Sequence, residues 1–261
     1  MTRSSLERAA PWLTALSLFI IWWLTVVLFK IEAYILPTPL EAIGAIYKYR
    51  YPLMVHGSAT LFTTLIGFGI AVAFGLLLGI VIGSFRLAYC GLYPVLIGIN
   101  SVPKAALVPI FVIWFGVGAA PAIVTAFMLS FFPVVVNVAT GFATIEPELI
   151  DVLRSLGATR SDIIRKVGIP RSLPHFFASL KIAITLAFVG SVIAEIVAGN
   201  SGIGNVMLIA GSNFNVPLVF AALLVVGAMG IGMYAIFALF ERRLTGWSVR
   251  SAGEIEYASG G

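Results

Sequence analysis

The chain has 261 residues, of which 60% are hydrophobic and only 10% charged, and its mean hydropathy is +1.07. Too little polar surface is present to cover a water-soluble globule, so the composition predicts an all-α, polytopic membrane protein. The net charge of +5 comes without an aromatic-basic RNA motif or a DNA-reading helix, which argues against nucleic acid as a partner, and the single cysteine, Cys90, excludes an intrachain disulfide.

The first predicted membrane span covers residues 11–29, within a run without charged residues between Arg8 and Lys30. At about 1.5 Å per residue, such a run is long enough to cross a hydrocarbon core of about 30 Å. A secretory signal is the alternative. We favour the span, because the run is longer than a usual signal core and no clear small-residue cleavage site follows it.

An interfacial helix is predicted after the first span, because Leu40, Ile43 and Tyr47 recur at helical spacing beside charged residues. Two partners fit such a helix. It could help to seat an external binding protein, or it could rest on the headgroups of membrane lipid, which we favour.

The second and third spans are predicted at residues 57–84 and 90–115. The second is rich in glycine, and Gly75 and Gly79 stand in the small-xxx-small register that allows close helix approach. The third is interrupted by two prolines around Lys104. Broken helices in a membrane occur where they line a cavity or the protein interior, so Lys104 is a candidate for the translocation pathway. Snorkelling toward headgroups and bridging to a neighbouring helix are the alternatives.

Three further spans are predicted at residues 122–144, 180–199 and 217–240. Asn137 in the fourth could face the substrate or hold another helix, and we favour the second role. Glu195 lies in the fifth, where a carboxylate is costly and indicates a function or a partner. Its possible partners are the lysine of the third span, backbone amides, a subunit interface or the substrate itself.

Residues 145–176 form the one polar segment between hydrophobic spans, and they predict a helical hairpin. The first helix is expected to begin at Pro147, to carry acidic residues near its positive end, and to end at Gly157. Those acidic residues are Glu148 and Asp151. The apolar residues that share one face, with Arg154 pointing elsewhere, are Leu149, Leu153 and Leu156.

The second helix of the hairpin has a candidate capping box in Thr159 and Asp162, and we expect Gly168 and Pro170 to stop it. A basic helical hairpin between membrane spans has the shape expected of a docking site for a soluble protein. The alternative is an ordinary cytoplasmic loop that its positive charge keeps inside.

This segment resembles a motif of the binding-protein-dependent ABC importers, whose membrane subunits carry a cytoplasmic loop of the form EAA, three residues, Gly, nine residues, Ile, one residue, Leu-Pro. Asp151-Val152-Leu153 stands in place of EAA, Gly157 follows at the right distance, and Val167-Gly168-Ile169-Pro170 closes the motif. All spacings match, whereas the two alanines do not. Other runs are similar to the branch that imports nitrate, taurine, alkanesulfonates and pyrimidine-type vitamin precursors: Pro103-Lys104-Ala105, Trp114-Phe115-Gly116, Phe132-Pro133 and Ala194-Glu195.

The resemblance implies a permease of the type I importer fold in a bacterial cytoplasmic (inner) membrane. Its partners would be two copies of an ATPase subunit, an extracytoplasmic substrate-binding protein and a second copy of the permease. The substrate would be a small polar solute such as a sulfonate, taurine, nitrate or a similar organic anion, or alternatively a pyrimidine or vitamin precursor or an aromatic acid. The residues implied in ATPase coupling are Glu148, Leu149, Asp151, Leu153, Arg154, Gly157, Ala158, Ile169 and Pro170.

The distribution of basic residues predicts the orientation. If both ends of the chain and the 145–176 segment are cytoplasmic, only Lys30, Lys48 and Arg50 remain outside, with Lys104 within the membrane. This orientation also places the hairpin where ATP is available.

The chain has no GxxxxGK[ST] pattern, so ATP hydrolysis is expected in a separate subunit and the chain itself is not expected to be an enzyme.

Two other classes of protein, a membrane enzyme and a secondary transporter or channel, fit the sequence less well than a permease. A membrane enzyme would need a nucleophile and base, and the sequence offers no such set, metal site or cofactor motif. A secondary transporter or channel is the other alternative, although we find no convincing internal repeat.

Overall fold

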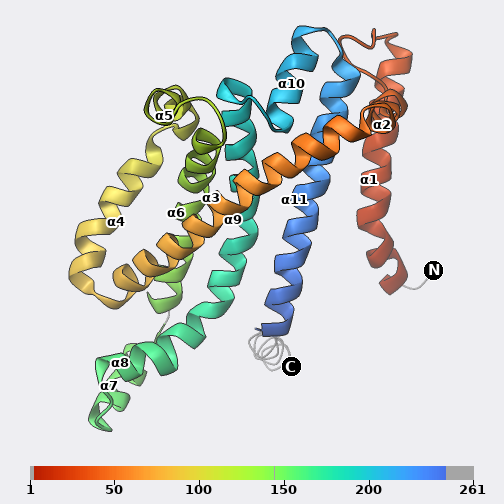
Figure 1. The fold of residues 1–261 in the computed structure, drawn as a ribbon. Helices are drawn as coiled ribbons and strands as arrows, with labels where there is room; N and C mark the ends of the chain where they lie inside the picture. Colours follow the sequence, from red (N-terminus) through yellow and green to blue (C-terminus); the bar gives the residue numbers. More distant parts are fainter. Residues whose placement is uncertain (1–2, 144, 245–261) are drawn as a thin grey trace.

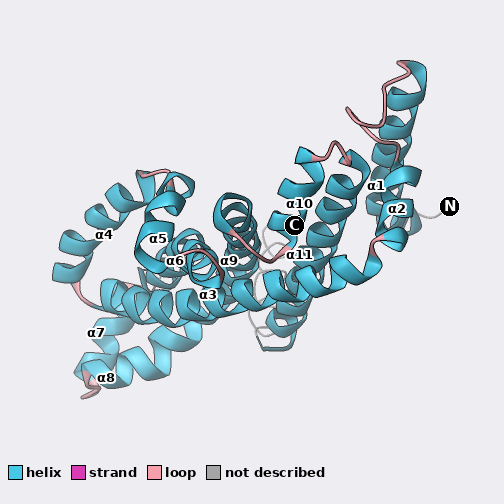
Figure 2. Cartoon of the chain, turned by 45° about the horizontal axis from the view of Figure 1, so that its top comes forward, coloured by secondary structure: helices cyan, strands magenta, loops and turns pink. Residues whose placement is uncertain are grey.

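The computed structural model describes residues 3–143 and 145–244, and all the secondary structure within these ranges is helical (Figure 2). The all-α fold predicted from composition is therefore confirmed. In chain order the elements are α1 (Arg3–Leu28), α2 (Pro39–Lys48), α3 (Arg50–Ser84), α4 (Arg86–Ser101), η1 (Lys104–Leu107), α5 (Val108–Phe115), α6 (Ala119–Ala143), α7 (Pro147–Ser155), α8 (Arg160–Ile163), the π-helical turn η2 (Ile164–Gly168), α9 (Ile169–Ala198), α10 (Ile203–Ser212) and α11 (Val216–Leu244).

In the described part of the chain, five helices are long and apolar enough to cross a membrane, and a sixth span results if one bent pair is counted as a unit. The bent pair is α4 followed by η1 and α5, with an angle of 76° at the break. It occupies the region where we expected one interrupted span. Val102 is extended before Pro103, as the steric clash with a following proline requires. The predicted last residue of the fourth span, Thr144, lies outside the described residues.

Helix α6 forms the centre of the bundle and packs most extensively on α3 and α9 (Figure 1). Small side chains let the helices approach closely: a Cβ atom on Gly75 would lie 2.7 Å from the Cβ of Val134, and one on Gly79 would lie 2.7 Å from the Cβ of Val138. Both valines are fully buried. Association of helices in lipid depends on such contacts, because lipid tails are as apolar as the side chains.

One prediction about helix boundaries is wrong. Gly168 and Pro170 do not stop the second helix of the hairpin, since α8 continues through the π-helical turn η2 directly into α9. Pro170 lies in the first turn of α9, directly after the π-helical turn, where the N–H of Ile169 donates to Ile164 O, so the helix continues through the proline. The second arm of the hairpin and the fifth span are therefore one continuous helical rod.

Helix α1 stands at the side of the bundle and is fixed near its C-terminal end. The indole N–H of Trp22 donates to the carbonyl oxygen of Pro37 at 3.0 Å, and the Trp22 ring lies 5.4 Å from that of Phe220 in α11. In Figure 1 the beginning of α1, the end of α11 and the α7–α8 hairpin lie at the lower side of the molecule, whereas α5 and α10 lie at the upper side.

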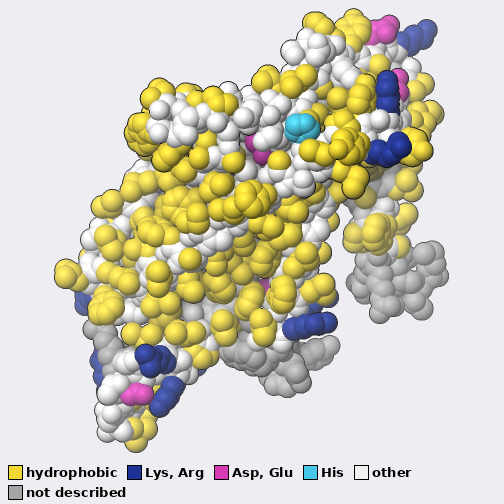
Figure 3. All heavy atoms as spheres, viewed as in Figure 1, with side chains coloured by type: hydrophobic (Ala, Val, Ile, Leu, Met, Phe, Trp, Pro, Cys, Tyr) yellow, Lys and Arg dark blue, Asp and Glu magenta, His cyan; other side chains and the backbone are white. Residues whose placement is uncertain are grey.

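The surface matches a protein that spans a membrane. On the face seen in Figure 3, hydrophobic side chains cover the middle of the molecule, and Lys and Arg gather near the two ends. The hairpin end carries several of these basic residues.

Candidate functional site

The candidate site is the hairpin, which we define as residues 147–168 of α7, α8 and η2. Helix α7 begins with Pro147 in its first turn and carries Glu148 near its positive end, and both features confirm the predicted start. Its end is a Schellman motif: Gly157 N–H donates to Arg154 O at 2.9 Å, and Ala158 N–H donates to Leu153 O at 3.0 Å. The hairpin therefore turns sharply after α7.

The backbone conformation at position 157 favours glycine. Its φ of +83° lies in the left-handed region, which side chains with a Cβ adopt at a cost. A Cβ atom at this position would have no other atom within 4 Å, so space does not select glycine.

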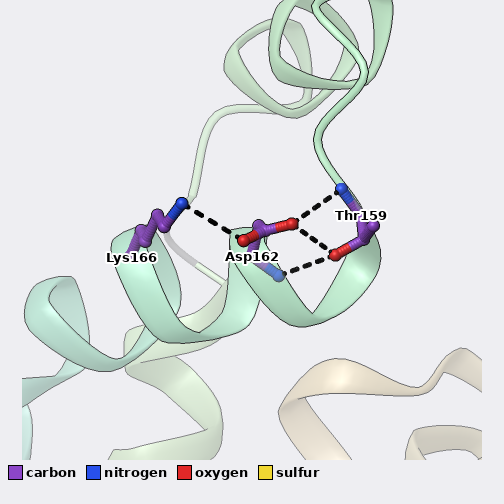
Figure 4. Close-up of polar contacts among 3 residues, drawn as sticks. All are labelled: Thr159, Asp162 and Lys166. Atoms are coloured by element: carbon purple, nitrogen blue, oxygen red, sulfur yellow. Dashed lines mark hydrogen bonds and ion pairs between the residues drawn. The ribbon is translucent and has the colours of Figure 1, made fainter.

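The capping box predicted for α8 is confirmed (Figure 4). Thr159 N–H donates to Asp162 Oδ2 at 3.2 Å, Asp162 N–H donates to Thr159 Oγ1 at 3.2 Å, and the Thr159 hydroxyl also donates to the Asp162 carboxylate. Lys166 Nζ lies 3.2 Å from Asp162 Oδ1. The hydrogen bond from the Thr159 hydroxyl, with a further contribution from Lys166, lowers the pKa of Asp162 to about 2.

The base of the hairpin is locked to the ends of α3 and α6 by Phe142. A Cβ atom on Gly83 would lie 2.6 Å from the Cβ of Phe142, and a Cβ atom on Gly168 would overlap the Phe142 ring. We call the Phe142 side chain, which lies between Gly83 and Gly168, the Phe142 wedge. Next to it, a Cβ atom on Gly141 would lie 2.7 Å from the Cα of Ser172. Side chains at these glycines would force the helices apart, so Phe142 packs closely between the end of α3 and Gly168 at the end of η2. Phe142 was not identified from the sequence, where it is one of many phenylalanines in an apolar run.

The two arms of the hairpin enclose a groove of about 350 Å³ near its tip. Its lining includes Leu153, Gly157, Ala158 and Lys166. Leu156, which also lines the groove, is 78% exposed, and Val152 in α7 is 55% exposed. An apolar tip beyond the end of the membrane helices is a surface suited to a protein partner.

The residues implied in ATPase coupling fall into two groups. Those of the first arm lie along α7 and its turn: Glu148, in the first turn of α7, is exposed, and Asp151 forms an exposed ion pair of 3.4 Å with Arg154. Leu149 instead packs toward the core. Ile169 and Pro170 lie at the base, in the first turn of α9.

The structure does not bring the three pathway candidates into one site. Lys104 Nζ donates to the carbonyl oxygen of Asn100 at 3.0 Å and to its side-chain oxygen at 2.6 Å, within the bent pair. Asn137 Nδ2 donates to the carbonyl oxygen of Pro133 in its own helix at 2.9 Å. Glu195 is 3% exposed, and its partners are Thr60, Thr63 and the backbone N–H of Gly204.

A comparison with family models now identifies the class of protein. The model of the family described as "Binding-protein-dependent transport system inner membrane component" matches residues 71–246, which is more than half of the chain. The chain belongs to this family. The permease is thus a transport component of the membrane part of ABC importers, a family whose members in general work with an ATPase and a substrate-binding protein.

Named relatives place the permease in the branch that its sequence motifs resembled. It is 28% identical over 246 residues to the formylaminopyrimidine transport permease protein ThiX of Halalkalibacterium halodurans, covering 94% of this chain and 98% of ThiX. It is 32% identical to the riboflavin transport system permease protein RibX of Chloroflexus aurantiacus, with coverages of 90% and 88%. The taurine transport system permease protein TauC of Escherichia coli K12 is 27% identical, with coverages of 88% and 86%.

The fold of the permease also matches a solved transporter. An inward-facing structure of the MetNI methionine ABC transporter aligns with a TM-score of 0.67 at 20% identity, covering 76% of this chain and 98% of that chain. The likeness supports the predicted type I importer fold.

Proposed function

We propose that two copies of this permease form a pathway for a small polar solute, and that each copy is driven by an ATPase subunit lodged against its hairpin. When ATP draws the two ATPase subunits together, the hairpins move and the spans change between inward and outward openings. The observation that carries this proposal is the continuous rod formed by α8, η2 and α9, which extends from the exposed hairpin into the membrane.

The contacts of the hairpin fix its shape, which transmission of a movement to the membrane helices requires. The Schellman motif fixes its turn, the capping box fixes the start of its second arm, and the Phe142 wedge fixes its base against α3 and α6. A force on the tip would therefore reach three membrane helices together. The exposed Leu156 and Val152 offer an apolar grip to the ATPase, and Arg154 offers a charge-assisted contact.

We place the hairpin and both chain ends in the cytoplasm and the permease in a bacterial inner membrane. The basic residues at the hairpin end support this orientation under the positive-inside rule. The described start of α1 and the end of α11 lie on the same side as the hairpin, as an even number of spans requires (Figure 1).

For the substrate we propose a sulfonate, taurine, nitrate or a similar small organic anion, which the resemblance to TauC supports. A pyrimidine or vitamin precursor is the second candidate, supported by ThiX and RibX. Lys104 remains the proposed pathway residue, because its positive charge suits an anion. The side chain of Asn137 instead donates a hydrogen bond to Pro133 O within α6. Thermal melting of the cognate binding protein with taurine, an alkanesulfonate, nitrate, a formylaminopyrimidine and riboflavin separates the two candidates, because the true substrate raises the melting temperature.

Replacement of Gly157 tests the coupling role. In the transporter reconstituted with its ATPase and binding protein, we expect Gly157→Val to abolish most substrate-stimulated ATP hydrolysis and uptake. A β-branched residue in the left-handed region carries strain of about 1–2 kcal/mol, which favours a different hairpin turn. Gly157→Asn is the matched control, because asparagine tolerates this conformation, and it should retain coupling. Unchanged uptake and stimulated ATP hydrolysis in Gly157→Val would exclude the coupling role.

A further inference from the structure

The N-terminus of α10 is capped by side chains from two other helices. Gly202 N–H donates to Nδ1 of His56 at 3.1 Å, Ile203 N–H to Oγ1 of Thr60 at 2.8 Å, and Gly204 N–H to Oε2 of Glu195 at 3.0 Å. His56 and Thr60 belong to α3, and Glu195 belongs to α9. The first N–H groups of a helix have no acceptor within the helix, so these bonds replace the missing partners.

Two of the three capping residues, Thr60 and Glu195, are also joined to each other. Thr60 Oγ1 donates to Glu195 Oε2 at 2.8 Å, while the same oxygen accepts the Ile203 N–H. Thr63, also in α3, lies 3.4 Å from Glu195 Oε1. Together, His56, Thr60 and Glu195 with the backbone of residues 202–204 form what we call the clasp.

The backbone at Gly202 and Gly204 packs closely against the side chain of Glu195. A Cβ atom on Gly204 would lie 2.7 Å from the Cβ of Glu195, and a Cβ atom on Gly202 would overlap its carboxyl group. Gly202 also has a φ of +97°. Glycine at both positions therefore allows the backbone before α10 to fold around the buried carboxyl group of Glu195.

Separation of α10 from α3 or α9 would remove several hydrogen bonds at once. The carboxyl group of Glu195 would lose donors in an environment where an unsatisfied polar group is costly, and the start of α10 would lose its acceptors. Outside the clasp, α3 and α9 pack mainly on α6. The clasp is thus a direct polar link between α3, α9 and α10 at the end of the molecule opposite the hairpin.

We propose that Glu195 is a positioning residue and does not contact the substrate: through the clasp with Thr60 and His56, it makes α10 and the adjoining ends of α3 and α9 move as one unit during transport. The proposal uses the membership of the permease in its family. It does not depend on the role proposed for the hairpin or on the identity of the substrate.

Hydrogen exchange of the 202–204 amides tests the clasp directly in the complete transporter, with the ATPase in its resting state and in an ATP-trapped state. The wild-type amides should stay protected in both states. Thr60→Val, which keeps the shape of the side chain, should speed their exchange by about tenfold, and Thr60→Ser should restore protection. Loss of wild-type protection in either state would overturn the proposal, because the three helices would then separate during the cycle.

Thr64→Val is the matched control. Thr64 lies one turn further along α3 and is fully buried, but its hydroxyl has no hydrogen-bond partner among the described residues. Its replacement should change neither exchange nor transport. Glu195→Leu provides a second variant, since its side chain cannot accept the bonds that Thr60 and Gly204 N–H both give to Oε2.

A functional measurement distinguishes positioning from simple folding. We expect Thr60→Val and Glu195→Leu to raise the ATP hydrolysed per solute imported by about threefold, without changing the affinity of the transporter for the loaded binding protein. If both variants merely lowered the amount of assembled transporter and left this ratio at the wild-type value, the clasp would be an ordinary folding contact. A change in solute selectivity of Glu195→Leu would instead place Glu195 in the pathway and contradict the proposal.

Discussion

At the scale of single residues, Asp162 illustrates how a local hydrogen-bond pattern sets both structure and titration. Its carboxylate accepts from the N–H and the hydroxyl of Thr159 and lies 3.2 Å from Lys166 Nζ. All of these interactions favour the charged form, so the pKa falls from 3.8 to about 2. The folded hairpin therefore binds this proton more weakly than the unfolded chain does.

The sign of the pH effect follows from this lowered pKa. Asp162 contributes stability to the start of α8 above its unfolded pKa, and the contribution is lost as the pH falls from about 4 toward 2. We expect Asp162→Ala to speed hydrogen exchange of the capping-box amides at positions 159 and 162 several-fold at neutral pH and to remove the acid dependence. Asp151→Ala, which removes an exposed carboxylate of the same hairpin, should leave these amides unchanged. Equal effects of the two variants would show that the capping box does not hold α8.

At the scale of elements, the contact between α3 and α6 depends on small residues along one side of α3. A Cβ atom on Gly79 would lie 2.7 Å from the Cβ of Val138 and 2.9 Å from the carbonyl oxygen of Val135. Gly69 lies in the same helix, but a Cβ atom there would have no neighbour within 4 Å. The two glycines thus differ only in what faces them.

We predict that Gly79→Ala lowers the free energy of unfolding of the permease by about 1–3 kcal/mol, because the added methyl group separates α3 from α6. Gly69→Ala should be neutral or stabilising by up to about 1 kcal/mol, since alanine has the higher helix propensity. Equilibrium unfolding in mixed detergent micelles, followed by tryptophan fluorescence, measures both changes. A larger loss for Gly69→Ala would contradict the packing described for α3.

At the scale of the whole molecule, the hairpin and α10 lie at opposite ends (Figure 1). The transport cycle proposed above requires the hairpin end to face the cytoplasm. Cysteine labelling can test this, because Cys90 is the single cysteine of the chain and can be replaced by alanine. Ser155 in the hairpin and Ser212 in α10 are both exposed and provide the two reporter positions.

In intact spheroplasts, a membrane-impermeant maleimide should label Ser212→Cys and should not label Ser155→Cys. Permeabilisation should make Ser155→Cys reactive, because the reagent then reaches the cytoplasmic side. The unsubstituted Cys90→Ala protein controls for background. The reverse pattern would invert the orientation and remove the hairpin from the reach of the ATPase.

The sequence by itself determined the features that depend on neighbouring residues. A 60% hydrophobic composition predicts membrane spans, the Thr159 and Asp162 spacing predicts the capping box, and the glycine at position 157 predicts the end of α7. These signals are readable because their physical causes, burial of apolar surface and local hydrogen bonding, act within a few turns of helix.

Only the tertiary structure decided how distant residues meet. The partners of Glu195 include Thr60, 135 residues away, and neither residue by itself indicates the other. The Phe142 wedge joins three segments, and the passage of the helix through Gly168 and Pro170 depends on a π-helical turn that local rules for proline do not predict. In each case the stabilising contact exists only after helices pack, because a side chain can satisfy a buried polar group or fill a glycine notch only once the fold has brought the two together.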